Sequence, residues 1–407
     1  MATRRSSAAA PTTPPERSIA RKKDETKKSG LKQCTRVLSL HKGKLQTYTL
    51  KYDDATMYVG EIHVGSRQRH GRGVYYTAQG DVLDGEWKDD RFHGFGTRDF
   101  ATTRDRHEGM YHKDKRHGRG TYLWANGDKY MGEFYNGRMH GKGVLLSAST
   151  GDVFEGTWVK GVVAHGTKRF ANGDTLQGTV SASTWNVDGT LTGEGVKTYR
   201  NGNEYRGRFD RGVQSGFGTF HWRSTGNVYA GMWVANTMDG YGRMEYMPSM
   251  PLADSGRCHV YVGTFAKGEF HGHGRIEYAN GDVYEGAFER NVRHGRGVFR
   301  GRWDSYEGRW EDNHPQGVGC YIGDTVTYHG QWVGGWPQGR GMYTCRASGD
   351  RKRVQIHQGQ CADDPNLTFN PLILLEYSIG DLFRIQRDVD EGIVGSFRGG
   401  AVSNVQL

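Results

Sequence analysis

The sequence predicts an all-β fold: an elongated, twisted, antiparallel ribbon built from about twelve β-hairpin repeats. Three observations predict it. First, 62 of the 407 residues are glycine, about twice the average share of roughly 7%. Second, the hydrophobic fraction of 35% is too low to fill several globular cores, although aromatic residues are plentiful at 12%. Third, one short pattern recurs along the chain at nearly constant spacing.

Residues 1–44 are predicted to form a basic, disordered tail. Residues 1–45 contain twelve Lys and Arg against three Asp and Glu, a charge of +9, which accounts for nearly all of the net charge of +10. Such a segment could bind an anionic membrane surface or the acidic surface of a cytoskeletal polymer, or be solvated without a partner. The basic residues that could make this contact are Arg21, Lys22, Lys23, Lys27 and Lys28.

Residues 45–57 look like half of a repeat and are predicted to cap the front of the ribbon, because an exposed strand edge would invite aggregation. The repeat array is predicted over residues 58–345. There the pattern aromatic-x-Gly-x-aromatic, as in Tyr284-Glu-Gly-Ala-Phe, has twelve copies, most of them 22 to 24 residues apart. The third position is glycine in every copy: Gly60, Gly85, Gly109, Gly132, Gly156, Gly178, Gly207, Gly231, Gly263, Gly286, Gly308 and Gly330.

Each copy is predicted to contain two strands of about six residues. Residue types alternate with period two, and turn dipeptides such as Asn126-Gly127 and Asn280-Gly281 interrupt the alternation. A lone hairpin is marginally stable in water, so the copies must pair edge to edge with their neighbours. Most copies continue with x-Gly-x-Gly, as in His294-Gly-Arg-Gly. The aromatic rings of one copy are expected to stack over the glycines of the next.

These registered copies resemble the MORN repeat (membrane occupation and recognition nexus), whose pattern is YxGxWxxGxxxGxGxxxxxxGDxY. The resemblance covers about residues 58–345. Two places depart from it. The fifth and sixth copies, residues 154–204, lose a glycine at Lys168 and gain residues around Ser181–Asp188. An insertion at 247–258 lengthens the loop between the eighth and ninth copies. Bends or partner contacts are expected there, with sequence drift as the alternative.

Residues 346–407 are predicted to form a non-repeat C-terminal cap and tail. The stretch 371–394 is the most apolar of the chain, and a short helix is expected over Asp381–Glu391. A docking segment for a partner is the alternative interpretation of this stretch.

No catalytic, metal-binding or cofactor-binding residues are predicted. A nucleotide-binding G-x-G must open a helix, whereas here another strand follows it in copy after copy. The histidines that precede many of these glycines should lie about 9–10 Å apart in neighbouring copies, too far to share a metal ion. Their expected role is a hydrogen bond across a turn. These histidines, called the histidine ladder below, are His70, His93, His117, His140, His165, His271 and His294.

The expected function is that of a non-catalytic scaffold or interaction protein, because many similar copies offer weak contacts that add through effective concentration. The MORN resemblance implies a structural component of a cytoskeletal or ciliary/flagellar (axonemal) assembly, located in the cytoplasm, cytoskeleton or cilium. Its partners would be other proteins of that assembly and, through the ribbon ends, further copies of itself. The alternative is a peripheral membrane protein that binds anionic phospholipid through the tail and repeats. Nucleic acid is not an expected partner, because the body is nearly neutral.

Overall fold

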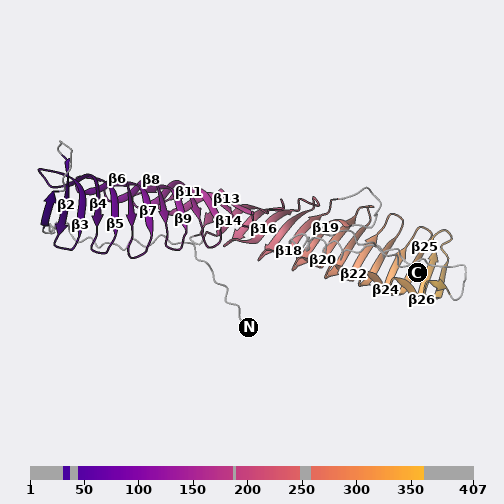
Figure 1. Ribbon diagram of the computed structural model, residues 1–407. Helices are drawn as coiled ribbons and strands as arrows, with labels where there is room; N and C mark the ends of the chain where they lie inside the picture. The colour runs from indigo at the N-terminus through magenta and orange to yellow at the C-terminus, as the bar shows by residue number, and fades with distance from the viewer. Residues whose placement is uncertain (1–30, 37–44, 187–188, 248–257, 362–407) are drawn as a thin grey trace, which may run out of the picture. The chain divides into compact units, whose positions relative to one another are not determined.

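A computed structural model describes residues 31–36, 45–186, 189–247 and 258–361 of the chain (Figure 1). These residues form 28 β-strands, and none of them lies in a helix. The prediction of an all-β, antiparallel hairpin-repeat fold is confirmed. The basic residues of the tail, the insertion at 248–257 and the helix expected over Asp381–Glu391 lie outside the described residues.

The chain divides into two compact units, which we describe separately. Unit 1 contains the described residues up to 201 together with 208–213, and unit 2 contains 202–207 and the described residues from 214 onward. In unit 1 the strands β1 to β14 pair antiparallel in chain order, from β1 with β2 to β13 with β14. The strands are β1 (Leu31–Arg36), β2 (Leu45–Tyr52), β3 (Met57–His63), β4 (Arg69–Tyr76), β5 (Val82–Lys88), β6 (Arg91–Asp99), β7 (Arg106–His112), β8 (Lys115–Leu123), β9 (Lys129–Tyr135), β10 (Arg138–Leu146), β11 (Val153–Val159), β12 (Val162–Arg169), β13 (Thr175–Trp185) and β14 (Leu191–Thr198).

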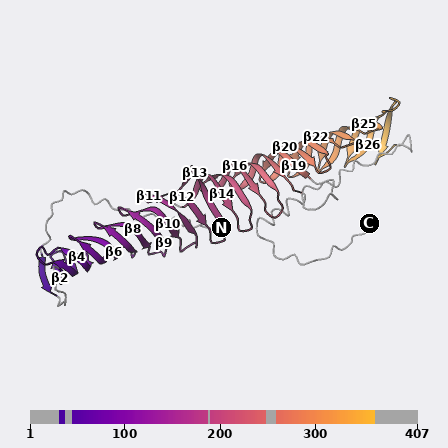
Figure 2. The same ribbon diagram turned by 90° about the horizontal axis from the view of Figure 1, so that it is seen from above.

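The strands of unit 2 follow the same plan (Figure 2). From β16 onward each strand pairs antiparallel with the next one. The strands are β15 (Glu204–Asp210), which is divided between the units, β16 (Val213–His221), β17 (Val228–Val234), β18 (Thr237–Glu245), β19 (Cys258–Ala266), β20 (Glu269–Tyr278), β21 (Val283–Glu289), β22 (Val292–Arg300), β23 (Ser305–Glu311), β24 (His314–Ile322), β25 (Val326–Val333), β26 (Trp336–Cys345), β27 (Arg351–His357) and β28 (Gln360–Cys361).

Tight two-residue turns close the hairpins and connect each hairpin to the one before it. Asp89 and Asp90, between β5 and β6, both have positive φ, +51° and +69°, as the favoured hairpin turns require. The Asp90 N–H donates to the Arg69 carbonyl at 3.0 Å, and Asp90 Oδ1 accepts the Arg69 N–H at 2.8 Å. Asn291 makes the same two bonds in unit 2. The turn residue therefore fixes the register of consecutive hairpins.

A second connection lies at the opposite end of the strands, in the loops that carry Asn-Gly-Asp. Asp128 is buried there, with 3% of its surface exposed. Its Oδ1 accepts the N–H of Ala148, in the loop of the next hairpin, at 2.8 Å, and its Oδ2 accepts from Asn126 Nδ2 at 2.7 Å. Asn227 in unit 2 accepts the Met247 N–H in the same way at 3.0 Å. Each hairpin is thus tied to its neighbour at both ends.

Tyrosines in the first position of the repeat form the centre of the core. In each unit their hydroxyls donate to the carbonyl three residues further along the same strand, as Tyr58 does to Glu61 at 2.8 Å. Each ring also makes edge contacts; for example, Tyr284 lies 5.1 Å from both Phe288 of its own hairpin and Trp310 of the next. The core tyrosines, all with 0% exposure, are Tyr58, Tyr130, Tyr205, Tyr229, Tyr261, Tyr284, Tyr306 and Tyr328.

The two glycines of x-Gly-x-Gly have different roles. Gly295 has φ +71° and lies in a β-bulge, where only glycine is free of strain. Gly297 lies beneath the ring of Tyr284, and a Cβ there would collide with that ring. The expectation that aromatic rings lie over the glycines of the next copy needs correction, because Tyr284 and Gly297 belong to the same hairpin. What the next hairpin contributes is a hydrogen bond: Trp310 Nε1 donates to the Gly297 carbonyl at 3.2 Å.

The fifth copy departs from the repeat at a different residue from the one expected. Gly156 pairs with Gly166, so the glycine beneath the aromatic ring is present, and Lys168 lies beyond it, opposite Phe154. The missing glycine is that of the bulge, where β12 has the single residue Ala164 between its paired residues. The shorter bulge explains why counting along the sequence placed the loss at Lys168.

Residues at both ends of the array also form strands. Strand β1 lies inside the range 1–44 that the sequence assigned to the tail, and it pairs with β2 through contacts such as Cys34 opposite Leu50. The half-repeat 45–57 contributes β2, which pairs with β3 as well. At the other end, β27 and β28 extend the pairing into the range 346–407.

Candidate functional site

Strand pairing aligns the repeat glycines in a row across the sheet of each unit. Gly109, Gly120, Gly132, Gly143 and Gly156 are successive partners on β7 to β11 of unit 1. In unit 2 the row runs from β16 to β26 and includes five of the predicted repeat positions: Gly231, Gly263, Gly286, Gly308 and Gly330. On the face away from the core tyrosines this row presents only backbone, because side chains at these positions would point toward the tyrosine rings.

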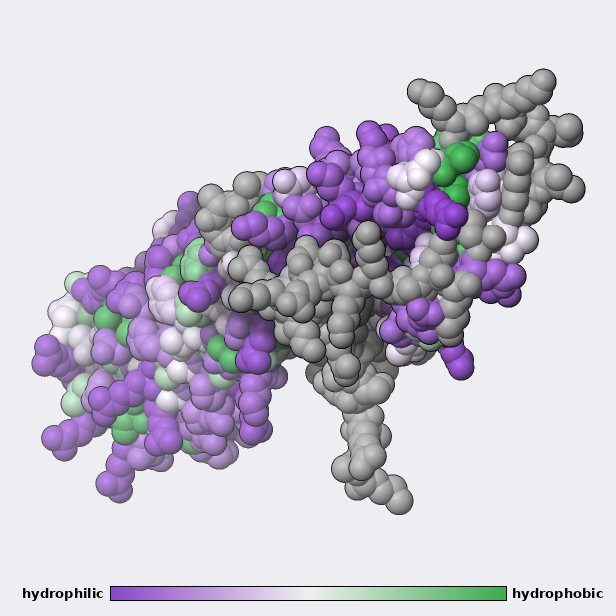
Figure 3. All heavy atoms as spheres, turned by 90° about the vertical axis from the view of Figure 1, so that its left-hand side faces the viewer, coloured by the Kyte–Doolittle hydropathy of each residue, from purple (hydrophilic) through white to green (hydrophobic). Residues whose placement is uncertain are grey.

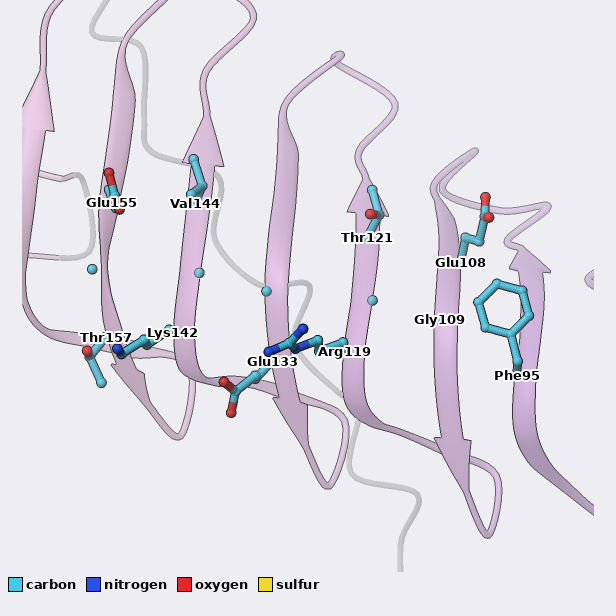
Figure 4. Close-up of a pocket in the computed structure, with 14 residues that line it drawn as sticks. Phe95, Glu108, Gly109, Arg119, Thr121, Glu133, Lys142, Val144, Glu155 and Thr157 are labelled. Atoms are coloured by element: carbon cyan, nitrogen blue, oxygen red, sulfur yellow. The ribbon is translucent and has the colours of Figure 1, made fainter.

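Two rows of side chains border the glycines on the face opposite the core tyrosines. They come from the positions that alternate with the buried ones, because successive side chains of a strand point to opposite faces. In unit 1 Glu108, Thr121, Val144 and Glu155 lie on one side of the glycines (Figure 4). Arg119, Glu133, Lys142 and Thr157 lie on the other side.

These rows and the glycine floor form a groove of about 770 Å³, which we call groove 1. Arg119 and Lys142 are exposed and form no ion pair within 4.0 Å with any carboxylate of the described residues. Phe95, half exposed at 50%, lies at one end. Groove 1 therefore offers charges of both signs and one aromatic ring that the fold does not use.

Unit 2 has a corresponding groove of about 1090 Å³, which we call groove 2. Groove 2 is more basic than groove 1, because three arginines, Arg296, Arg300 and Arg309, line it against two carboxylates, those of Glu285 and Glu307. Arg296 and Arg309 are direct cross-strand partners. Like charges in this arrangement destabilise a sheet, so an anionic group bound between them would relieve the repulsion.

The histidine ladder lies at the turn end of the strands. Residues that replace histidine at this position reach the turn of the next hairpin: Gln338 Oε1 accepts the Gln358 N–H at 2.8 Å, and Gln316 Oε1 accepts the Gly334 N–H at 3.0 Å. His70 points toward the next turn too, with its Nδ1 3.4 Å from Asp89 Oδ1. The ladder position thus faces a turn, and that turn belongs to the following hairpin. The expected hydrogen bond is made there by the glutamines, whereas the Nδ1 atoms of His70, His117 and His140 have no hydrogen-bond partner.

His107 occupies the place of the core tyrosine in the third hairpin. It is fully buried, and its Nδ1 lies 2.7 Å from the hydroxyl of Tyr111. Burial, with a smaller contribution from the nearby Arg116 charge, lowers the pKa of His107 to about 3. The imidazole is therefore neutral at physiological pH and serves the core rather than a catalytic site.

In the view of Figure 3 the coloured surface is mainly hydrophilic, with apolar side chains in scattered places. Among the described residues no helix is long and apolar enough to cross a bilayer. Arg21, Lys22, Lys23, Lys27 and Lys28 lie outside the described residues, so the predicted electrostatic contact stays a prediction.

A repeated hairpin, tied to its neighbours at both strand ends and built around a buried tyrosine and paired glycines, defines the chain as a β-hairpin repeat protein. It belongs to the MORN repeat family. The family model matches more than half of the chain, in twelve segments: 68–82, 84–102, 107–129, 130–151, 154–175, 185–204, 205–226, 229–247, 261–283, 284–304, 306–325 and 328–349. The number of copies agrees with the prediction, although the first match begins at 68 and the sixth at 185.

Part of the chain is similar to curated proteins named Alsin. It is 34% identical to Alsin of Mus musculus and 35% identical to Alsin of Homo sapiens over 96 residues. In both cases the match covers 24% of this chain and 6% of the relative. A solved extracellular domain of a putative one-component system from B. thetaiotaomicron aligns with 79% of this chain and 62% of its own, at 9% identity and a TM-score of 0.11, which supports no conclusion.

Family membership supports a non-catalytic interaction or scaffold role, because MORN repeats mediate protein or membrane interactions. The predicted glycines mark the floor of each groove, but the residues that border it were not singled out from the sequence. The signal was available: these residues are the second and fourth positions of each copy and the residues that follow the two glycines of x-Gly-x-Gly. They range from charged to polar to apolar among the copies, whereas the first and fifth positions are aromatic or aliphatic in every copy but the third, which has His107.

Proposed function

We propose that the chain is a scaffold whose grooves bind extended segments of partner proteins in a cytoskeletal or axonemal assembly. The observation that carries this proposal is the pair of charged rows on either side of a floor without side chains. Arg119 and Lys142 in groove 1 are exposed and unpaired within the described part of the chain, and the core does not need them. Residues kept charged and unpaired on a regular face are available to a partner.

A partner segment that lies along the glycine row crosses the strands and meets the same pair of positions in each hairpin. Equivalent positions are two strands apart, about 9–10 Å, so the contacts repeat with that period. Each contact between exposed charges is weak, about 0–1 kcal/mol, and several together give useful affinity. The cytoskeletal or axonemal setting, and location in the cytoskeleton or cilium, rest on the resemblance to stand-alone MORN proteins.

The test compares two double variants of the full-length chain in cells. Arg119→Glu with Lys142→Glu reverses both cations of groove 1. Lys115→Glu with Lys160→Glu makes the same charge change at exposed lysines that do not line it. The wild type and the control should remain in the detergent-insoluble cytoskeletal fraction, and the groove variant should be released. Release of the wild type by detergent, or equal retention of the groove variant, would contradict the proposal.

A second candidate is peripheral binding to anionic phospholipid, favoured by the charge of +9 on residues 1–45. Each basic residue near an anionic surface contributes about 1 kcal/mol, which salt screens. Vesicles that contain phosphatidylserine should then bind the full-length chain at low salt, and deletion of residues 1–45 should abolish the binding. If vesicle binding is absent, or unchanged by the deletion, the lipid candidate is removed.

A further inference from the structure

Three potential metal ligands converge where the first two repeat hairpins meet. His63 ends β3, His70 lies in β4 and Asp89 opens the turn after β5. One ligand atom of each residue lies within 4.8 Å of the others, and this is the one such group of three among the described residues. The rings of His63 and His70 have centroids 4.1 Å apart. His70 Nδ1 lies 3.4 Å from Asp89 Oδ1.

From this cluster we infer a binding site for a divalent transition metal of the Zn²⁺ type. Bonds of about 2.0–2.2 Å to nitrogen and oxygen place two ligands of a tetrahedral ion about 3.3–3.6 Å apart. The His70–Asp89 separation already has this value, and the remaining separations, up to 4.8 Å, close by small side-chain rotations. Two imidazoles and a carboxylate suit Zn²⁺ and related ions better than Mg²⁺ or Ca²⁺. Water would complete the coordination.

The environment of the three residues supports a ligand role. His70 Nδ1 is shielded from solvent and makes no hydrogen bond, although a buried polar atom without a partner costs about 1–3 kcal/mol. A metal ion would satisfy it. The backbone around the cluster is fixed: the His63 N–H donates to the Gln68 carbonyl at 2.9 Å, and Asp90 holds the turn against β4. The ligands are therefore presented by rigid elements, as a metal site requires.

The repeat pattern does not join these residues, because they occupy three different positions of the repeat. His63 and Asp89 are not ladder positions; they belong to a strand end and to a turn. Elsewhere in the ladder, His117 lies beside His112 with ring centroids 5.6 Å apart, and both His117 and His140 have an Nδ1 without a hydrogen-bond partner. Neither of them belongs to a group of three potential ligands among the described residues. In the hairpin of β9 and β10, His140 takes the place of His70, but Tyr135 takes the place of His63, with ring centroids 5.5 Å apart.

That hairpin supplies both the informative variant and its control. His63→Tyr installs the residue found at Tyr135, so the fold should tolerate it while one ligand is removed. His140→Ala removes a histidine from the equivalent of position 70 without touching the cluster. Full-length wild type and both variants are stripped of metal, kept reduced, and titrated with Zn²⁺ against a chromophoric chelator. The wild type should bind one more Zn²⁺ per chain than His63→Tyr, and His140→Ala should match the wild type.

Two further measurements keep the outcome decisive. Asp89→Asn changes an exposed turn residue and should lower the affinity of this site for Zn²⁺ at least tenfold. This variant provides the test if His63→Tyr fails to fold. Zn²⁺ should also raise the thermal midpoint of the wild type more than that of His63→Tyr, because binding to the folded state stabilises it. The inference is overturned if His63→Tyr and Asp89→Asn bind as much Zn²⁺ as the wild type, or if His140→Ala loses the same amount.

Discussion

Replacing His107 should remove an acid-sensitive element from the core of unit 1. The proposed variant is His107→Tyr with Tyr111→Phe, which installs the pair that the next hairpin has as Tyr130 and Phe134. The two pairs have matching edge-to-face geometry, with centroids 4.9 Å apart for His107 and Tyr111 and 5.2 Å for Tyr130 and Phe134. The variant thus keeps the packing and removes the titrating imidazole.

The magnitude follows from the depressed pKa of His107. In the folded chain this pKa is about 3, whereas an exposed histidine has a pKa of about 6.5. Between these values the unfolded state binds more protons than the folded state, so the free energy of unfolding falls as the pH is lowered through 6.5 toward 3. Between pH 7 and pH 5 the loss is about 2 kcal/mol, or about 30-fold in the local opening equilibrium.

Native-state hydrogen exchange measures this loss in the hairpin itself. Protection factors of the β7 and β8 amides, corrected for intrinsic rates, should fall about 30-fold in the wild type between pH 7 and pH 5. In the variant they should fall much less. The hairpin of β21 and β22 serves as an internal control, since Tyr284 there does not titrate in this range. Equal losses in the wild type and the variant would refute the assignment of the acid sensitivity to His107.

Three other predictions concern packing, the loop connection and the ends of the array. Gly297→Ala should lower the stability of its hairpin by about 1–3 kcal/mol through collision with the tyrosine ring, whereas Gly65→Ala, which meets nothing within 4 Å, should leave the thermal midpoint unchanged. Asp128→Ala should cost about 1–3 kcal/mol by removing the hydrogen bonds that its buried carboxylate accepts from Ala148 and Asn126, and Asp128→Asn should cost less because Asn227 makes the same bond to the next loop; urea unfolding separates the two. Open strand edges should drive self-association, which a monomeric mass in light scattering at micromolar concentration would contradict.

The repeat could be recognised from the sequence because its period, its glycines and its alternation all depend on local geometry. The connections between hairpins could not be placed as easily. Asn126-Gly127 is a turn, as predicted, but it belongs to the longer loop in which Asn126 supports Asp128. The tight turn at Asp89 and Asp90 contains no glycine, because aspartate tolerates positive φ and its side chain bonds the previous hairpin.

The candidate sites show the same division between local pattern and spatial arrangement. The floor of each groove follows from glycines that the sequence marks. The charged borders of the grooves could not be predicted from the glycines alone, because they depend on which residues face away from the core. The cluster of His63, His70 and Asp89 could not be predicted either, because its three positions in the repeat meet only after the hairpins pair. The bulge in β12 is one residue shorter than in other copies. Aligning the copies by residue spacing therefore misplaces the missing glycine, because strand pairing sets the register of a sheet.

The paired connections at the strand ends have a mechanical consequence. Within unit 2, a pull on β28 away from β27 loads the bonds of the outermost hairpin first, because each hairpin is tied only to its immediate neighbours. The hairpins should therefore peel off one after another rather than break together. Each step would release one repeat of 22 to 24 residues, about 80 Å of extended chain. Under tension, such a unit would extend in increments of nearly constant length.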